Sequence, residues 1–199
     1  MENFIMFRDG KNIYLGPIRK EDTTFLTVSI NDPEVSQFLT VFAPTSEDEE
    51  EKWLSGLADR KPYDIILSIR LKKSNEIIGN IGLHHISYKD GTATAGCFIG
   101  RKDLWSKGYG SEALMVLLEY AFNTLNLHKV SAEVYDFNPR SKRSLEKCGF
   151  VVEGLQKEHR YRNGRRVGCY MMAVFKRNFR PLWKKYKKEF IDKKCTCKC

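Results

Sequence analysis

Residues 104–113 of this chain have the composition and spacing of a loop that binds phosphate. Gly108 and Gly110 stand one residue apart, between a strand-like run and a segment with apolar residues at helical spacing. Glycine lets the backbone turn sharply and lets a ligand approach the amide groups. The first turn of the following helix then offers unpaired N–H groups and a positive dipole end. A plain structural turn would also explain two glycines, so the elements on both sides must decide between the two interpretations.

The apolar pattern predicts the elements that position this loop. Strands are expected at residues 13–17, 65–71, 76–86, 92–100, 129–135, 150–158 and 167–175. Helices are expected at 20–30, 34–39, 46–58, from the glycines to 125, and at 138–148. Successive strands favour antiparallel pairing, whereas the strand–helix–strand unit at 92–135 requires a parallel pair. The fold class is therefore mixed α/β (α+β), with a central, mostly antiparallel sheet of about seven strands flanked by helices.

Charge divides the 199 residues into two parts. Residues 176–199 hold ten Lys/Arg against Glu189 and Asp192, so nearly all of the net charge of +9 lies there. The part before this tail lacks the composition of a nucleic-acid binder. No run is long and apolar enough to span a membrane, and the start of the chain does not resemble a signal peptide, which predicts a cytoplasmic protein. We expect one domain over 1–178 and a basic tail over 179–199.

The six cysteines divide in the same way. Cys97, Cys148 and Cys169 stand among apolar neighbours and are expected to be buried thiols. Cys195, Cys197 and Cys199 alternate with other residues at the end of the chain. They lack the Cys-x-x-Cys spacing and the second ligand pair of a metal site, so we expect an oxidisable tail and no metal centre.

Four segments together resemble the GNAT superfamily of acetyl-CoA-dependent N-acetyltransferases, over roughly residues 11–178. They resemble its first strand–helix junction (17–22), its fourth strand and pyrophosphate loop (96–100 and 104–113), its Asn-x-x-Ser…Lys-x-Gly-Phe segment (138–150), and its closing hairpin (153–154 and 163–164). Within the superfamily the chain is similar to the branch of ribosomal-protein alanine and spermidine N-acetyltransferases. The resemblance implies a sheet that splays between its fourth and fifth strands.

The resemblance also implies where acetyl-CoA, the acetyl donor, would bind. The pantetheine arm would lie in the gap against the backbone of Phe98, Ile99 and Gly100, and the pyrophosphate on the amides of Ser106, Lys107, Gly108, Tyr109, Gly110 and Ser111. Asn138 and Ser141 match positions that contact the arm, although Asn138 also has the position of a helix cap. Lys142 and Lys147 are candidates for the phosphates of the donor, and a solvated helix face is the alternative.

The implied reaction is direct attack of a primary amine on the thioester. A base must neutralise the amine, and a backbone N–H near Phe98 or Ile99 would stabilise the oxyanion. The positions that would supply side-chain acids and bases depart from the family pattern. Trp105 stands where Gln or Arg is frequent in the family, and Leu145 stands where many members have a tyrosine. Thr94 takes the place of a glutamate, and Gly168 takes the place of an aspartate.

His84, His85 and Tyr135 are therefore the predicted catalytic residues. Histidine titrates in the required range, and alternation along a strand points at most one of the pair into the cleft. Tyr135 is a candidate proton donor to the leaving thiolate. The alternatives are satisfied or exposed histidines, simple packing of Tyr135, and water relayed from backbone carbonyls.

Aromatic residues in the tail recur at helical spacing, opposite a face of lysines: Phe179, Trp183, Tyr186 and Phe190. This basic amphipathic helix is expected to dock on its own domain or on a partner in a homodimer. The alternatives are that the helix lies on an anionic membrane or contacts the RNA of the ribosome.

The predicted function is acetyl transfer from acetyl-CoA to a protein N-terminus, a polyamine or an amino sugar. A polyamine would require several carboxylates at the cleft, for which the acidic run 47–51 and Asp32 are candidates. The chain has Leu145 and Thr94 where the family has a tyrosine and a glutamate. These differences also suit an alternative: an acyl-CoA-binding module that has lost catalysis and that its basic tail tethers to RNA or a membrane.

Overall fold

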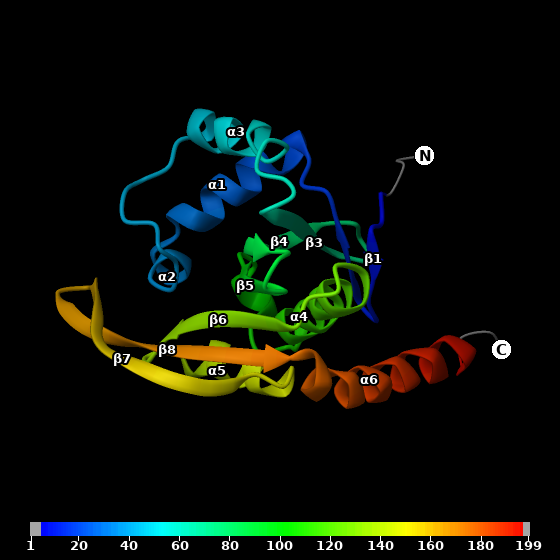
Figure 1. The fold of residues 1–199 in the computed structure, drawn as a ribbon. Coiled ribbons are helices and arrows are strands. Elements are labelled where there is room, and N and C mark those ends of the chain that lie inside the picture. Colours follow the sequence, from blue (N-terminus) through cyan, green and yellow to red (C-terminus); the bar gives the residue numbers. More distant parts are fainter. Residues whose placement is uncertain (1–4, 197–199) are drawn as a thin grey trace.

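The computed structural model describes residues 5–196, with side chains up to residue 189, and contains one open sheet of eight strands among these residues. The strands are β1 (Arg8–Asp9), β2 (Ile13–Gly16), β3 (Ile65–Leu71), β4 (Ile77–Ser87), β5 (Thr92–Ile99), β6 (Lys129–Tyr135), β7 (Val151–Arg162) and β8 (Arg165–Phe175). Their order across the sheet is β1-β2-β3-β4-β5-β6-β8-β7 (Figure 1). The mixed α/β fold class is confirmed. The predicted number of seven strands is wrong by one, because β1 is a two-residue edge strand without a pattern of its own.

The helices lie on both faces of this sheet. They are α1 (Thr23–Asn31), α2 (Pro33–Ser36), α3 (Glu47–Ser55), α4 (Tyr109–Glu119), α5 (Pro139–Lys147) and α6 (Lys176–Thr196), with short turns η1 (Lys20–Asp22), η2 (Lys102–Leu104) and the π-helical η3 (Tyr120–Thr124). Leu67 and Ile69 of β3 belong to the core under α4. Arg70, the next residue, is buried on the other face and pairs with Asp22 at the start of α1. Successive side chains of β3 point to opposite faces of the sheet. Helix α4 therefore covers one face, and helices α1 to α3 cover the other.

The sheet splays between β5 and β6, as the resemblance predicted. These strands pair in parallel only from Thr92↔Lys129 to Thr94↔Ser131. β5 then continues beside β4 as far as Ile99, while β6 continues beside β8 as far as Tyr135. The remaining halves of β5 and β6 therefore have one edge each that no strand covers.

The closing hairpin is longer than the sequence predicted. The strands β7 and β8 run up to Arg162 and from Arg165, and extend past the body of the molecule (Figure 1). Asn163 and Gly164 both have positive φ, 48° and 80°, as a type I′ turn requires. This turn keeps the strands paired up to Arg162 and Arg165.

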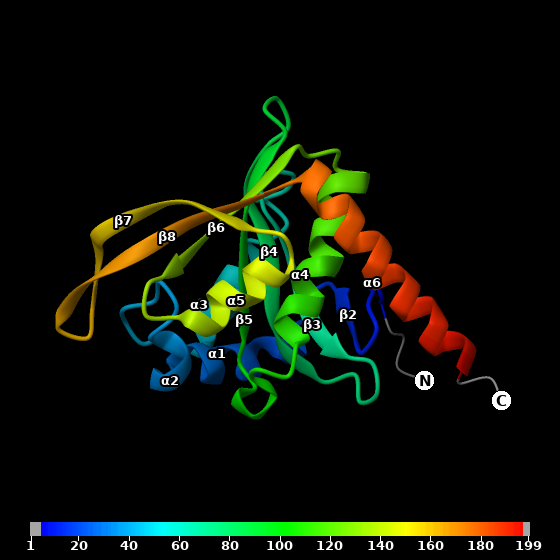
Figure 2. The same ribbon diagram turned by 90° about the horizontal axis from the view of Figure 1, so that it is seen from below.

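Helix α6 docks on its own domain and runs beside α4 (Figure 2). Phe179 is 1% exposed and its ring lies 5.3 Å from that of Phe122. Trp183 stacks between Phe179 and Tyr186, and the hydroxyl of Tyr186 accepts a hydrogen bond from the Lys11 N–H. The side chain of Phe190 and the cysteines Cys195, Cys197 and Cys199 lie outside the residues whose side chains are described. The predicted properties of that end therefore remain predictions.

None of the helices within residues 5–196 combines the length and the apolar character needed to cross a membrane. In the same part of the chain, no cluster of three or more His, Cys, Asp or Glu side chains has the arrangement of a metal site.

Candidate active site

A cavity of about 370 Å³ lies where β5 and β6 separate. It is lined from one face of the sheet by the start of α4 and by α5, and from the other face by α2 and the residues that follow it. Val130, Ala132 and Val134 of β6 pack in the core with α4, so Glu133 and Tyr135 alternate onto the opposite face. We call Phe38, Leu39, Thr40, Glu133 and Tyr135 the α2-side wall. The cavity thus joins the two faces through the gap in the sheet.

The predicted phosphate loop has the geometry of an anion cradle. Ser106 and Gly108 have positive φ of 62° and 92°, and α4 begins at Tyr109. The helical hydrogen bonds of α4 begin at Glu112, whose N–H donates to the Gly108 carbonyl at 2.9 Å. The N–H groups of Tyr109, Gly110 and Ser111 precede it and so have no partner within the helix. All three residues line the cavity, as do Ser106 and Gly108, whereas Lys107 does not.

Two cations of α5 complete this phosphate side. Arg143 and Lys147 line the cavity, and Ser111 Oγ lies 2.8 Å from Ser144 Oγ, which joins α4 to α5. A cradle of free amides with two cations fits a pyrophosphate.

Asn138 and Ser141 also line the cavity. Asn138 Oδ1 accepts a hydrogen bond from the Ser141 N–H at 3.1 Å, so Asn138 caps α5. Its Nδ2 and the Ser141 hydroxyl remain available toward the cavity. Lys142 does not line it, and its Nζ lies 4.5 Å from the Tyr170 ring.

The edge of β5 presents two amide groups to the gap. The Gly100 N–H donates to the Ile78 carbonyl of β4 at 2.8 Å, so Gly100 is bonded within the sheet and does not line the cavity. Backbone groups alternate between the two neighbours of a strand, which directs the N–H groups of Ile99 and Cys97 into the gap and that of Phe98 toward β4. Phe98 and Ile99 both line the cavity, and the Ile99 carbonyl accepts a hydrogen bond from Trp105 Nε1 at 2.7 Å.

The two histidines lie at the edge of this arrangement. Neither is among the residues that line the cavity. His85 is exposed at a bulge, with φ of 51°, and its N–H donates to Asp64 Oδ1. His84 Nδ1 lies 3.9 Å from the same oxygen, and its Nε2 faces the backbone of Gly96, which lines the cavity. Burial lowers the pKa of His84 below its usual value, against the opposing effect of Asp64.

Tyr135 lies in the α2-side wall and is 7% exposed. Its hydroxyl accepts a hydrogen bond from Arg162 Nη2 at 2.8 Å, and its ring stacks on Phe137. Arg162 also donates to the Leu39 carbonyl and so joins the hairpin to the segment after α2.

Sequence reasoning missed several polar side chains of the cavity, among them Cys97, Glu133, Arg140 and Arg143. Glu133 stands at the centre of an otherwise apolar strand, a pattern that could have revealed it. Arg140 extends from α5 over the Trp105 ring, 3.8 Å from its centre, and burial lowers its pKa.

Cys97 corrects a prediction, because its side chain is exposed at the cavity wall, whereas Cys148 and Cys169 are buried as predicted. The surrounding protein still raises the pKa of Cys97 to about 12. The thiol is therefore neutral near pH 7 and a poor nucleophile.

Comparisons with known proteins agree with this geometry. The family model described as an acetyltransferase (GNAT) domain matches residues 12–151. The chain belongs to the GNAT acetyltransferase family. This GNAT chain is 30% identical to a Bacillus licheniformis protein named uncharacterized N-acetyltransferase p20, over 85% of this chain and 96% of that protein.

Solved structures share the same fold. The spermidine N-acetyltransferase from Vibrio cholerae, in complex with CoA and spermine, has a TM-score of 0.77 and 25% identity, over 84% of this chain and 98% of its own. RimJ from Mycobacterium smegmatis, in complex with CoA-disulfide, has a TM-score of 0.73 and 20% identity, over 82% and 81% of the two chains. The protein is thus a GNAT N-acetyltransferase, and its acetyl donor is acetyl-CoA.

Proposed function

We propose that this enzyme transfers the acetyl group directly to a primary amine while both substrates are bound. The observation behind the proposal is the single cavity that joins the phosphate side to the α2-side wall through the gap between β5 and β6. A donor bound from one face and an amine bound from the other would meet in the gap. Direct attack needs only this proximity and orientation.

The phosphate side would bind the donor. The free amides at the start of α4 and the cations Arg143 and Lys147 would hold its pyrophosphate, and the gap would hold the pantetheine arm beside Ile99. The N–H of Cys97 or Ile99 would stabilise the oxyanion that forms when the amine adds to the thioester carbonyl.

The α2-side wall would position the amine. Glu133, whose carboxylate lines the cavity, would bind the ammonium group. His84, neutral because burial lowers its pKa and oriented by Asp64, would take one proton through a water molecule. The amine then forms the C–N bond, the C–S bond breaks, and Tyr135 would protonate the leaving thiolate. Water from bulk solvent restores the proton of Tyr135, and the excess proton of the amide nitrogen leaves to solvent.

Thiol release from acetyl-CoA tests this function, with a panel containing an N-terminal peptide, spermidine, spermine and glucosamine. Spermidine and spermine belong in the panel because a structural neighbour is a spermidine N-acetyltransferase. We expect release with at least one amine, together with binding of acetyl-CoA by calorimetry. Binding of acetyl-CoA without release from any amine would contradict the proposal and favour a lapsed binding module. A double-reciprocal plot with parallel lines would contradict the ternary complex.

A further inference from the structure

One connected aromatic cluster, formed by Phe38, Trp105, Tyr135 and Phe137, borders the cavity. Phe38 lies edge-on to Trp105, with 6.4 Å between ring centres, and stacks on Phe137 at 5.8 Å. Phe137 stacks in turn on Tyr135 at 5.4 Å. Three of these four rings, those of Phe38, Trp105 and Tyr135, belong to residues that line the cavity.

Three guanidinium groups lie on this cluster, and we call them the arginine strip: Arg140, Arg162 and Arg165. Arg140 lies 3.8 Å from the centre of the Trp105 ring, Arg162 5.3 Å from that of Tyr135, and Arg165 5.7 Å from that of Phe137. The three cations thus contact one connected set of rings, and of the three only Arg140 lines the cavity.

The positive charge of the arginine strip is not neutralised by carboxylates. Among the residues that the structure describes, no Asp or Glu forms an ion pair with any of its three members. Arginine stays charged even where burial disfavours its charge, so three adjacent cations without counter-ions favour a bound anion.

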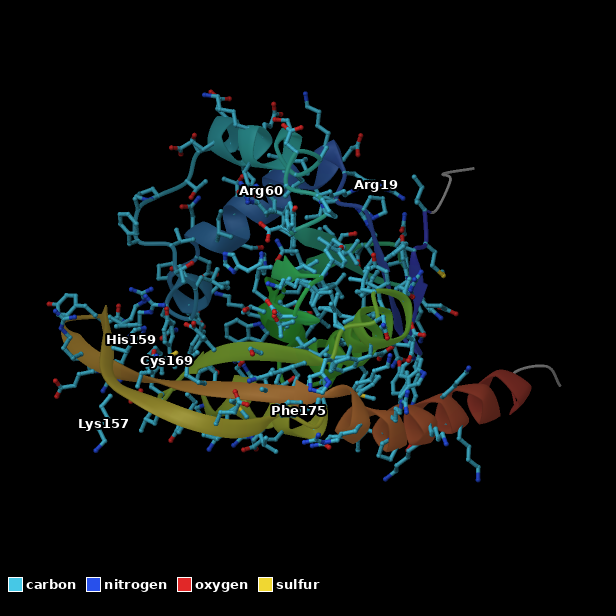
Figure 3. All side chains as sticks on the ribbon, viewed as in Figure 1. Arg19, Arg60, Lys157, His159, Cys169 and Phe175 are labelled. Atoms are coloured by element: carbon cyan, nitrogen blue, oxygen red, sulfur yellow. The ribbon has the colours of Figure 1, made fainter. Side chains whose placement is uncertain are left out.

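The positive charge continues outward along the β7–β8 hairpin. Residues 157–166 hold five Lys/Arg against Glu158. Figure 3 shows Lys157 and His159 on this hairpin, at the end away from α6. An acceptor that extends from the cavity toward the hairpin would therefore meet cations along its length.

The carboxylates that a polyamine would need are placed elsewhere or already paired. Asp32 forms an ion pair with Lys102 at 2.7 Å, and Glu49 accepts hydrogen bonds from Ser46 as part of the α3 cap. Asp48 and Glu51 line a separate shallow hollow. In the described part of the chain, Glu133 is the one acidic residue that lines the cavity, and it already pairs with Arg160 at 3.3 Å, which leaves room for at most a single ammonium group.

We propose that the acceptor is a primary amine carried by an anionic molecule, whose carboxylate or phosphate groups bind the arginine strip while its ammonium group binds Glu133. This inference rests on the proposed acetyl transfer and names its substrate class. An acidic polypeptide N-terminus and a phosphorylated amino sugar both present this chemistry.

Matched acceptor pairs test the inference and separate the two sources. One pair is a tetrapeptide with two aspartates after its N-terminal alanine and the same peptide with asparagines. The other pair is glucosamine 6-phosphate and glucosamine. Spermine is tested beside both pairs as an acceptor with several positive charges. We expect kcat/KM to be at least about tenfold higher for the anionic member of at least one pair, the effect of one charge-assisted hydrogen bond. The pair with the larger ratio identifies the source.

Two variants locate the effect. Arg165→Glu, at an exposed position, should lower the ratio of kcat/KM between the anionic and the neutral member toward one. Arg180→Glu on exposed α6 makes the same charge change away from the cavity and should preserve the preference. With the unaltered enzyme, raising the salt concentration should raise KM more for the anionic acceptor than for its neutral counterpart, which tests the inference even if a variant fails to fold.

Other results would overturn the inference. Equal rates within both pairs, or fastest turnover of spermine, would refute an anionic acceptor and leave the proposed acetyl transfer intact. Failure of every amine to release thiol from bound acetyl-CoA would instead refute the proposed transfer, and the acceptor class with it.

Discussion

At the scale of single residues, the proposed mechanism assigns binding of the ammonium group to Glu133 and removal of its proton to His84. Glu133 lines the cavity, and its carboxylate also accepts a hydrogen bond from Arg160 at 3.3 Å. His84 lies behind the cavity wall, next to Gly96. A carboxylate is suited to holding an ammonium group, and a neutral imidazole is suited to removing a proton from it.

Glu133→Gln should weaken binding of the amine without affecting the donor. Loss of one charged hydrogen bond predicts a KM for the acceptor that is about tenfold higher, with an unchanged dissociation constant for acetyl-CoA. Steady-state kinetics and calorimetry measure the two quantities. Glu153→Gln, which removes an exposed carboxylate paired with Lys129, is the matched control and should change neither. An equal loss in donor affinity would show that Glu133 supports the whole cavity instead.

The pH dependence of kcat tests His84. A base must be neutral to accept a proton, so kcat should fall as the pH drops through the pKa of His84, which burial places below its usual value of 6.5. The double variant His84→Ala/His85→Ala should lose this limb and lower kcat more than the affinity for acetyl-CoA. If its pH profile matches that of the unaltered enzyme, neither histidine is the base.

At the scale of elements, the loop between β5 and α4 shapes the proposed donor site. Its left-handed residues turn the chain so that the first amides of α4 face the cavity. A Cβ added at Gly108 would meet no atom within 4 Å, so glycine is required there for its φ of 92° and not for space.

Gly108→Ala should therefore act through backbone strain alone. The left-handed conformation costs a residue with a Cβ about 1–2 kcal/mol, so the loop should relax and raise KM for acetyl-CoA about tenfold. Gly164→Ala is a close control, because Gly164 has φ of 80°, equally open space and a place in the distant hairpin turn. We expect both variants to lose similar stability in thermal melts and only Gly108→Ala to change the KM.

At the scale of the whole molecule, α6 links the last strand back to the first part of the chain. Phe179 packs on Phe122 beyond the end of α4, and Lys11 pairs with Glu189 at 2.7 Å. Tyr186 packs against the core as well, with Lys11 over its ring. The helix that resembled an appendage packs against the core through Phe179, Leu182, Trp183 and Tyr186.

Phe179→Ala should consequently destabilise the entire fold. Removing a fully buried phenylalanine costs about 3–5 kcal/mol, which for a chain of this size lowers Tm by roughly 10 °C. Lys184→Ala, at an exposed position on the same helix, should change the free energy of unfolding by less than about 0.5 kcal/mol. Equal melting temperatures for the two variants would mean that α6 contributes nothing to stability.

The sequence by itself predicted the features that depend on neighbouring residues. The left-handed turn at Gly108, the Asn138 cap and the Asn163–Gly164 turn are short-range requirements on φ and on unpaired amides, and the structure confirms each conformation. The amphipathic pattern after Gly110 likewise predicted the buried face of α4, since helical period alone determines which side chains share a face. The fold class and the splay followed from these elements through the family resemblance.

Only the tertiary structure decided which side chains meet in the cavity. Glu133 faces the cavity because β6 pairs with β8 in one register, and a shift of one residue would turn it to the other face. The arginine strip joins α5 to both strands of the hairpin, on rings from segments as distant as Phe38 and Phe137. No local pattern encodes such contacts, because they depend on how far the strands diverge and how the layers pack. For this reason the sequence identified the acetyl donor, and the assembled cavity was needed to infer the acceptor.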